Sequence, residues 1–309
     1  MSAWTANDIP DQTGRTAIIT GANSGLGLVT ATELVRHGAD VVLAVRNTVA
    51  GEEAASAIRA EAPDATVSVR QLDLASLDSV RAFAERASDE LEQIDLLINN
   101  AGLVLLGPRR TTDDGFELHF GTNHLGHFAL TGLLLPLLEK GRSPRVVSLS
   151  SLSHKKAHLD FDDLMLEKTW DASAAYGASK LANTVFGIEL DRRLRAAGSS
   201  IVSTIAHPGV SRSNLTPRAW EDRGVFGKLV ASLYAAMNTQ PTEQGALPQL
   251  YAATAGAVCG GQFFGPSGKN EQRGGVTEVQ PNAEARDPGV GKELWGRSAQ
   301  LTGVSYLDT

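Results

Sequence analysis

The chain has 309 residues, of which 42% are apolar and 20% are charged, a composition typical of a folded globular protein. Its formal charge of −7 leaves no basic surplus to neutralise a nucleic acid or an anionic membrane, so neither is expected as a partner. The single cysteine, Cys259, excludes a framework of intrachain disulfides.

No targeting segment is predicted. Residues 1–15 lack the basic stretch followed by an apolar stretch that marks a signal peptide. No segment reaches about 18 continuous apolar residues, so no membrane span is expected. The apolar run at 130–138 is too short and contains Pro136. We therefore expect a cytoplasmic protein.

Short apolar runs alternate along the chain with segments of helical periodicity. Strands are predicted at residues 16–20, 41–45, 66–72, 94–98, 145–149, 201–206 and 261–264. Helices are predicted at residues 24–36, 49–60, 76–87, 116–138, 174–197, 242–253 and 289–302. Repeated β-α-β units with nearly continuous apolar strands imply an α/β fold, a doubly wound parallel sheet (Rossmann fold) of seven strands with helices on both faces. No Pro/Gly/Ser-rich linker divides the chain, so we expect a single domain over 1–309, with a lid-like substrate segment near 210–240.

The first predicted strand runs directly into a glycine-rich turn, and a helix follows it. Glycine lets the backbone approach a pyrophosphate closely, and the helix N-terminus offers free N–H groups to the anion. The spacing G-x-x-x-G-x-G differs from G-x-G-x-x-G, and no Gly-Lys-Ser/Thr ends the turn as in a P-loop. The alternative is a plain glycine-rich turn between strand and helix. The turn predicts a dinucleotide site that includes Gly21, Asn23, Ser24, Gly25, Leu26 and Gly27.

The end of the second strand indicates which dinucleotide is bound. A carboxylate often holds the adenine ribose about 20 residues after the turn, but here the strand ends in Ala44-Val45-Arg46-Asn47. The Arg46 guanidinium suits a 2′-phosphate, because it can donate forked, charge-assisted hydrogen bonds. We therefore expect NADP(H) in preference to NAD(H). The alternative is a solvated arginine at a strand end.

Four further motifs follow in order along the chain. They are Asn99-Asn100-Ala101-Gly102, Asn123 within Gly121-Thr-Asn-His-Leu-Gly126, Ser151 at the end of the fifth strand, and Tyr176-Gly-Ala-Ser-Lys180. With the glycine turn, they resemble the short-chain dehydrogenase/reductase family over residues 15–264. The segments Ala22-Asn-Ser-Gly-Leu-Gly27, Lys180-Leu-Ala-Asn183 and His207-Pro-Gly-Val-Ser-Arg-Ser213 are similar to the retinol dehydrogenase and WW-domain oxidoreductase-like subgroup.

This resemblance implies roles for residues along the cofactor. Asp73 and Leu74 are expected at the adenine, and Asn100, Ala101 and Gly102 beside the adenosine ribose. Residues 147–150 are expected on the nicotinamide side, and Lys180 at the nicotinamide ribose. The resemblance further places Pro208, Gly209, Ser211 and Ser213 at the carboxamide. It makes Asn123 a link between Lys180 and solvent through a water molecule.

The Tyr176–Lys180 pair has a chemical rationale. Reducing a carbonyl by hydride transfer needs an acid beside the oxygen, and a free tyrosine, with a pKa of about 10, is a poor relay at neutral pH. Lys180 shares a helix face with Tyr176, and a charge a few ångström away is worth about two to three pKa units. We therefore expect Lys180 to lower the pKa of Tyr176. Tyr176 then donates the proton in reduction, and Ser151 stabilises the substrate oxygen.

Several alternatives stay open. Ser150 competes with Ser151 for the substrate oxygen. The segment between Ser151 and Tyr176, which includes His154, His158, Phe161 and Met165, is either part of the substrate mouth or a solvated loop. No metal site is predicted, because the histidines lack matching ligands.

The motifs together predict an NADP(H)-dependent oxidoreductase that interconverts an apolar alcohol and its carbonyl. The alternative is a non-catalytic dinucleotide-binding regulator on the same fold. A small-molecule substrate is expected as partner, and the helices at 116–138 and 174–197 resemble those that pair in homo-oligomeric relatives.

Overall fold

The computed structural model describes residues 4–211 and 240–308. Its strands are β1 (Thr16–Thr20), β2 (Asp40–Val45), β3 (Val67–Gln71), β4 (Leu96–Asn99), β5 (Arg145–Leu149), β6 (Val202–Ala206), β7 (Phe263–Pro266) and β8 (Val276–Glu278). Its α-helices are α1 (Gly25–Arg36), α2 (Thr48–Glu61), α3 (Leu77–Glu90), α4 (Gly126–Leu138), α5 (Ala172–Ala196), α8 (Thr242–Thr254) and α9 (Pro288–Thr302). Shorter turns of helix are η1 (Ala6–Asp8), η2 (Phe120–Leu125), η3 (Leu152–Lys156), η5 (Lys269–Glu271) and η6 (Glu284–Arg286).

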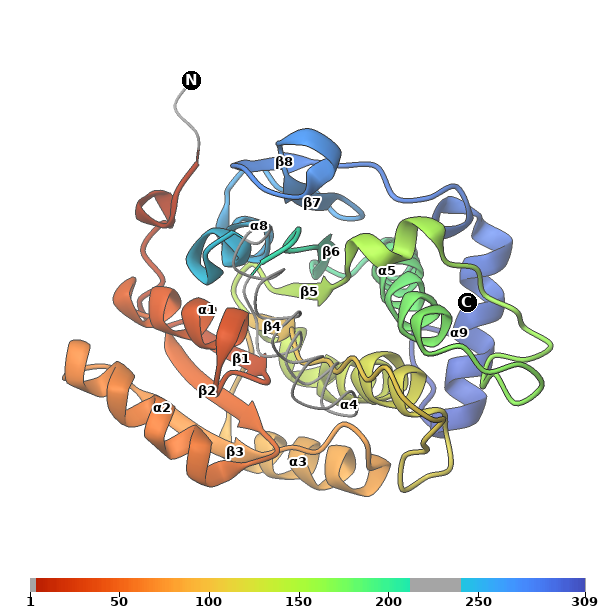
Figure 1. The fold of residues 1–309 in the computed structure, drawn as a ribbon. Helices are drawn as coiled ribbons and strands as arrows, with labels where there is room; N and C mark the ends of the chain where they lie inside the picture. The colour runs from red at the N-terminus through yellow and green to blue at the C-terminus, as the bar shows by residue number, and fades with distance from the viewer. Residues whose placement is uncertain (1–3, 212–239, 309) are drawn as a thin grey trace.

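The strands form one sheet in the order β3-β2-β1-β4-β5-β6-β7-β8, and helices cover both of its faces (Figure 1). All pairings from β3 to β7 are parallel, whereas β8 pairs antiparallel to β7. The chain reverses its direction of winding between β1 and β4, so the carboxyl ends of these strands border a crevice. The α/β fold predicted from the sequence is confirmed.

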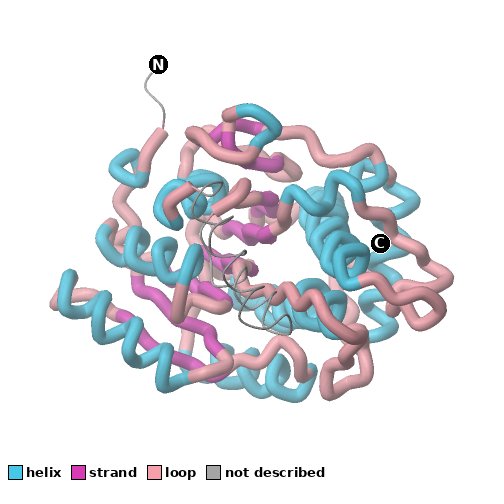
Figure 2. Tube along the Cα trace, viewed as in Figure 1, coloured by secondary structure: helices cyan, strands magenta, loops and turns pink. Residues whose placement is uncertain are grey.

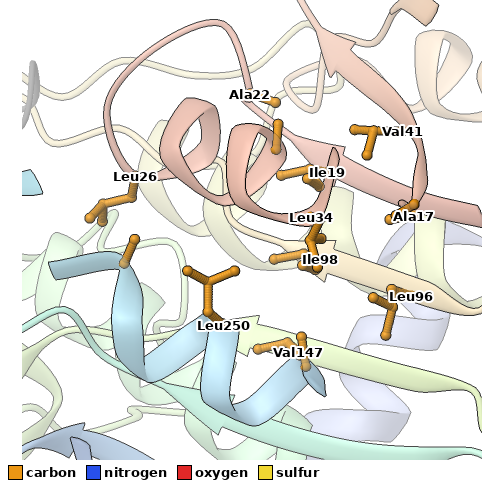
Figure 3. Close-up of a cluster of buried hydrophobic side chains, with 14 of the residues drawn as sticks. Ala17, Ile19, Ala22, Leu26, Leu34, Val41, Leu96, Ile98, Val147 and Leu250 are labelled. Carbon is orange, nitrogen blue, oxygen red and sulfur yellow. The ribbon is translucent and has the colours of Figure 1, made fainter. Parts of the chain in front are cut away.

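Side chains of successive strand residues point to opposite faces and build two apolar layers. In β1, Ala17 and Ile19 pack on the α1–α8 side (Figure 3), and Ile18 packs on the α3–α4 side. Leu34 of α1 and Leu250 of α8 complete the first layer. Because both faces are covered, the central strands are apolar throughout, which is why their sequences read as continuous apolar runs.

The prediction of seven strands was wrong, since β8 is an eighth. Its three residues, Val276–Glu278, are partly or fully exposed, so the segment carries no apolar run that would mark a strand. The strand is defined instead by its antiparallel pairing with β7, in which Phe264 lies opposite Glu278.

The predicted helix at 116–138 also differs from the structure. Residue Glu117 lies before the helix and makes an isolated bridge with Thr111. Its carboxylate accepts the N–H groups of His119 and Phe120, at 2.9 and 2.7 Å, and so satisfies donors at the helix start. Helix begins at Leu118, residues Phe120–Leu125 form the π-helix η2, and α4 continues from Gly126. Figure 2 draws the helices in cyan around the magenta strands.

The C-terminal helix α9 packs against both α4 and α5. Trp295 of α9 is 3% exposed and lies against Phe128 of α4 and Phe186 of α5. The Tyr306 hydroxyl donates to the Phe128 carbonyl oxygen at 3.1 Å and holds the end of the chain on α4. Among the described residues, none of the helices has the length and apolar character needed to cross a membrane.

Candidate active site

A cleft of about 510 Å³ lies along the carboxyl edge of the sheet. Its walls come from the segments after β1 to β6 and from α5, which is where open α/β sheets bind ligands. Most residues predicted from the sequence line it, namely Gly21, Asn23, Ser24, Gly25, Leu26, Gly27, Arg46, Asp73, Leu74, Asn100, Ala101, Gly102, Ser151, Tyr176, Lys180, Pro208, Gly209 and Ser211.

The glycine turn forms one end of the cleft. Gly21 has φ +66°, a left-handed conformation that favours glycine, and a Cβ on Gly27 would lie 2.7 Å from the Gly21 oxygen. The turn is tied to the segment after β4, because the Asn100 amide donates to the Thr20 carbonyl oxygen at 2.7 Å. Helix α1 starts at Gly25 with no side-chain cap from Ser24. Its first N–H groups lie at the edge of the cleft and are therefore available to bind an anion.

Arg46 and Asp73 follow β2 and β3 on the same side of the cleft. Within residues 4–211 and 240–308, no ion pair or hydrogen bond is recorded for the exposed Arg46 guanidinium. The Asp73 carboxylate accepts the Ala75 N–H at 3.0 Å, which fixes its position after the strand. Arg46 is therefore a cation available to a ligand at this end.

Tyr176, Lys180 and Ser151 meet at the other end of the cleft. Tyr176 and Lys180 lie one turn apart on α5, with the Lys180 ammonium 6.0 Å from the tyrosine ring centre. Lys180 is 3% exposed, and its Nζ donates to the Leu149 carbonyl oxygen at 3.1 Å. Ser151 caps η3 after β5, where its hydroxyl accepts the Ser153 N–H at 3.2 Å, and it lies close enough to the Tyr176 side chain to lower the pKa of that group. The three side chains can thus surround one oxygen atom.

The electrostatics of this group differ from the prediction. Desolvation raises the pKa of Tyr176 above its usual value of 10, and the influence of the nearby Ser151 hydroxyl only partly opposes this. Burial lowers the pKa of Lys180 to about 8. The expected lowering of the Tyr176 pKa by Lys180 is therefore wrong for the protein alone, because loss of water outweighs a charge 6.0 Å from the ring.

The competition between the two serines is decided by geometry. Ser150 is 2% exposed, and its hydroxyl donates to the Lys180 carbonyl oxygen at 2.9 Å and meets the Thr184 hydroxyl at 2.8 Å. Those bonds hold α5 against β5. The Ser151 hydroxyl makes no such bonds to α5 and forms hydrogen bonds only with Ser153 among the described residues, so Ser151, which lines the cleft with Tyr176, is the serine available to a substrate oxygen.

Asn123 lies behind the cleft wall rather than on it. It is buried within η2, where its side chain accepts the Leu103 N–H at 2.8 Å and donates to the Leu103 carbonyl oxygen at 3.1 Å and to Ser179 at 2.9 Å. The Ser179 hydroxyl in turn donates to the Tyr176 carbonyl oxygen at 2.8 Å. Asn123 therefore holds Leu103 and α5 together, while its predicted water link to Lys180 stays a prediction.

Some predicted residues lie elsewhere. Of residues 147–150, Leu149 and Ser150 line the cleft, but Val147 is buried in the apolar layer. The four candidates for the substrate mouth, His154, His158, Phe161 and Met165, do not line it. Ser213 and most of the predicted lid at 210–240 lie outside the described residues.

The cleft also includes residues that the sequence did not single out. Leu103, Val104, Leu152 and Val210 add apolar surface to the cleft, and Thr122 contributes from η2. Leu103, Val104 and Leu152 follow residues that the motifs singled out, and Val210 and Thr122 lie within motifs, so their neighbourhood in the sequence was a usable signal for all five.

The residues present fit a bound nicotinamide dinucleotide. Two buried polar atoms in the cleft, Asn100 Oδ1 and Thr122 Oγ1, have no hydrogen-bond partner among the described residues. A Cβ on Gly102 would lie 3.2 Å from Lys180 Nζ, a tight contact that glycine avoids. With the exposed Arg46 and the uncapped start of α1, the cleft offers donors for phosphates and hydroxyls along its length.

The comparisons with known proteins agree with this geometry. The family described as short chain dehydrogenase matches residues 15–224, and the chain belongs to this family of oxidoreductases acting on CH–OH and C=O groups. The chain is 41% identical to human retinol dehydrogenase 13 over 94% of its length and 85% of that protein. It is 38% identical to mouse polyprenol dehydrogenase, covering 97% of this chain and 88% of that one. The prediction of an enzyme, rather than of a non-catalytic dinucleotide-binding regulator, is thus confirmed.

A solved structure of an uncharacterized protein from Mycobacterium paratuberculosis is 42% identical, with a TM-score of 0.81 and 99% of each chain covered. The RhlG/NADP complex of Pseudomonas aeruginosa is 24% identical, with a TM-score of 0.64, over 82% of this chain and 94% of that one. This second likeness shows the fold alone.

Proposed function

We propose that the chain is an NADP(H)-dependent oxidoreductase that interconverts an apolar alcohol and its aldehyde or ketone. The observation that carries this proposal is the meeting of Ser151, Tyr176 and Lys180 in one cleft with the glycine turn and Arg46. A dinucleotide spanning that cleft would bring its nicotinamide to the tyrosine and its adenosine to the arginine.

The three side chains divide the proton work. When bound, the nicotinamide supplies or accepts the hydride. In reduction, Tyr176 Oη donates its proton to the carbonyl oxygen, and in oxidation it takes that proton back. The Ser151 hydroxyl donates a hydrogen bond to the same oxygen and stabilises the charge that develops there. The Lys180 ammonium stabilises the tyrosinate that remains after proton transfer.

The substrate class is inferred from the apolar side chains in the cleft. Leu103, Val104, Leu152 and Val210 line the same cleft as Tyr176 and offer apolar surface to a substrate. The similar proteins are named for retinol and polyprenol, which are both long apolar primary alcohols. We therefore propose a primary alcohol with an apolar chain, or its aldehyde, as the substrate.

The direct test is a panel of aldehydes of increasing chain length, with NADPH oxidation followed by absorbance. The value of kcat/KM should rise with the apolar length of the aldehyde, because burial of each CH₂ contributes about 0.8 kcal/mol to binding. Equal kcat/KM for short, charged and apolar aldehydes would contradict the substrate class. No turnover with any member would contradict the reaction.

Arg46→Ala tests the cofactor preference. The starting protein should bind NADPH more tightly than NADH, and the variant should lose roughly tenfold or more of its NADPH affinity, because hydrogen bonds to charged groups contribute about 1.5–3 kcal/mol. NADH affinity should stay within about twofold, as that ligand has no 2′-phosphate. Titrations followed by protein fluorescence measure both. Equal dissociation constants for NADPH and NADH in the starting protein would argue against the preference.

A further inference from the structure

Two buried histidines lie behind the cleft, one on each of the segments that follow β5 and β6. His154 and His207 are both 0% exposed, and their rings contact Phe263 with centroids 5.1 and 5.3 Å away. Neither side chain lines the cleft, and the proposed mechanism uses neither. Each nevertheless makes a hydrogen bond to the backbone of a residue that does line it.

The hydrogen bonds fix where each histidine carries its proton. His154 Nδ1 donates to the Ser151 carbonyl oxygen at 2.6 Å. His207 Nδ1 accepts the Gly209 N–H at 3.2 Å, so the proton of the neutral ring must sit on Nε2. That Nε2 lies 3.0 Å from Glu271 Oε2 and donates to it. Glu271 therefore sets the form of His207 that holds Gly209.

Glu271 also reaches the segment that follows Ser151. Its Oε1 accepts a hydrogen bond from the Lys155 ammonium, which lies in η3. The hydrogen bonds from His207, which has the larger effect, and from Lys155 lower the pKa of Glu271 to about 2. The carboxylate is therefore charged at any working pH. One side chain thus bridges Lys155 after β5 and His207 after β6.

The bridge comes from the turn between β7 and β8, which we call the hairpin tip (residues 267–275). The tip lies directly on the Gly209 turn, because the Val210 N–H donates to the Gln272 carbonyl oxygen at 2.8 Å. A Cβ on Gly209 would lie 2.4 Å from that same oxygen. Asn270 and Glu271 both have positive φ, at 55° and 56°, a strained backbone for residues with side chains. The tip is thus held in a conformation that aims Glu271 inward.

We infer that Glu271 is a positioning residue for hydride transfer. It acts through His207 on the Gly209 turn and is anchored through Lys155 to the segment that begins at Ser151. This inference rests on the proposed function, in which Ser151 holds the substrate oxygen, and on the placement of Gly209 at the carboxamide that the family resemblance implies.

Glu271→Ala and Glu271→Gln test the inference. Alanine leaves His207 Nε2 without its acceptor, so kcat should fall about tenfold, less than the roughly 100-fold loss that a displacement of about 1 Å can cause. The dissociation constant for NADPH, read from protein fluorescence without substrate, should rise severalfold. Glutamine keeps one acceptor oxygen for His207 while Lys155 turns to water, so it should restore kcat to within about threefold of the starting protein.

Glu278→Ala is the matched control, since Glu278 is exposed on the same hairpin and, within the described ranges, its side chain accepts a hydrogen bond only from Gln262, at 2.9 Å. It should leave kcat and NADPH affinity unchanged. A Glu271→Ala protein with a lower melting temperature but unchanged kcat and NADPH affinity would overturn the inference, as would a Gln variant as impaired as the Ala variant. The NADPH titration needs no turnover, so it reads the Gly209 turn even if the proposed aldehyde reduction fails.

Discussion

At the scale of single residues, the site depends on the buried ammonium group of Lys180. Burial lowers the pKa of Lys180 to about 8, and desolvation raises the pKa of Tyr176. At neutral pH, therefore, the lysine is largely charged and the tyrosine is protonated. This is the state that carbonyl reduction needs, since the phenol donates and the ammonium stabilises what remains.

The rate of carbonyl reduction should consequently fall as pH rises through about 8. Below that pH Lys180 keeps its charge, and above it the charge is lost, with kcat/KM approaching a tenfold decrease per pH unit. The measurement is kcat/KM for the best aldehyde of the panel from pH 6 to 9.5. A profile that stays flat to pH 9.5 would contradict a role for the ammonium.

The contribution of Lys180 to stability has the opposite pH dependence. The unfolded chain binds the Lys180 proton more tightly, with a pKa of 10.5 against about 8 when folded. The free energy of unfolding should therefore gain from this group as pH rises from about 8 to 10. A denaturation series at the same pH values separates the two effects, because activity and this contribution to stability change in opposite directions.

At the scale of elements, the close contact between α1 and the glycine turn shapes the phosphate end of the cleft. Gly27→Ala places a Cβ 2.6 Å from Asn100 Nδ2 and 2.7 Å from the Gly21 oxygen. We expect NADPH affinity to fall at least tenfold and stability to fall by about 1–3 kcal/mol, the usual cost of overpacking. Fluorescence titration and thermal unfolding measure the two losses.

Gly296→Ala provides the control, because a Cβ there meets nothing within 4 Å among the described residues and α9 lies away from the cleft. It should leave NADPH affinity unchanged and slightly stabilise its helix. If Gly27→Ala bound NADPH as tightly as Gly296→Ala does, the turn would not be the phosphate site.

The elements also show what sequence patterns can predict. Continuous apolar runs gave the central strands to within two residues at either end, because both faces of those strands are buried. The exposed strand β8 has no such run, and its pairing with β7 is a long-range event that local patterns do not encode. The π-helical stretch Phe120–Leu125 contains Asn123, whose hydrogen-bond partners Leu103 and Ser179 lie 20 and 56 residues away in the chain, and such long-range contacts are not encoded in a local pattern either.

For the candidate site, the motifs predicted which side chains react, but neither their pKa values nor the hydrogen bonds that position the segments around them. Tyr176 and Lys180 are readable from spacing, whereas the direction of the Tyr176 pKa depends on how much water the fold removes. The Glu271 bridge joins three segments far apart in the chain, and no local pattern marks it.

At the scale of the whole molecule, one sheet edge collects residues from Gly21 to Ser211 into a single cleft. The same fold places the hairpin tip between β7 and β8 against the segment after β6, and packs α9 against α4 and α5. The cytoplasmic location and the homo-oligomer predicted from the sequence remain predictions.

The central claim is that Tyr176 transfers the proton in a site that binds the dinucleotide independently of it. The most direct test is Tyr176→Phe, assayed for NADPH binding by fluorescence and for aldehyde reduction by absorbance in the same preparation. We predict an NADPH dissociation constant within about twofold of the starting protein and a loss of turnover of at least 100-fold, as general acid catalysis contributes about 10²–10⁴-fold. Turnover equal to that of the starting protein would contradict the account.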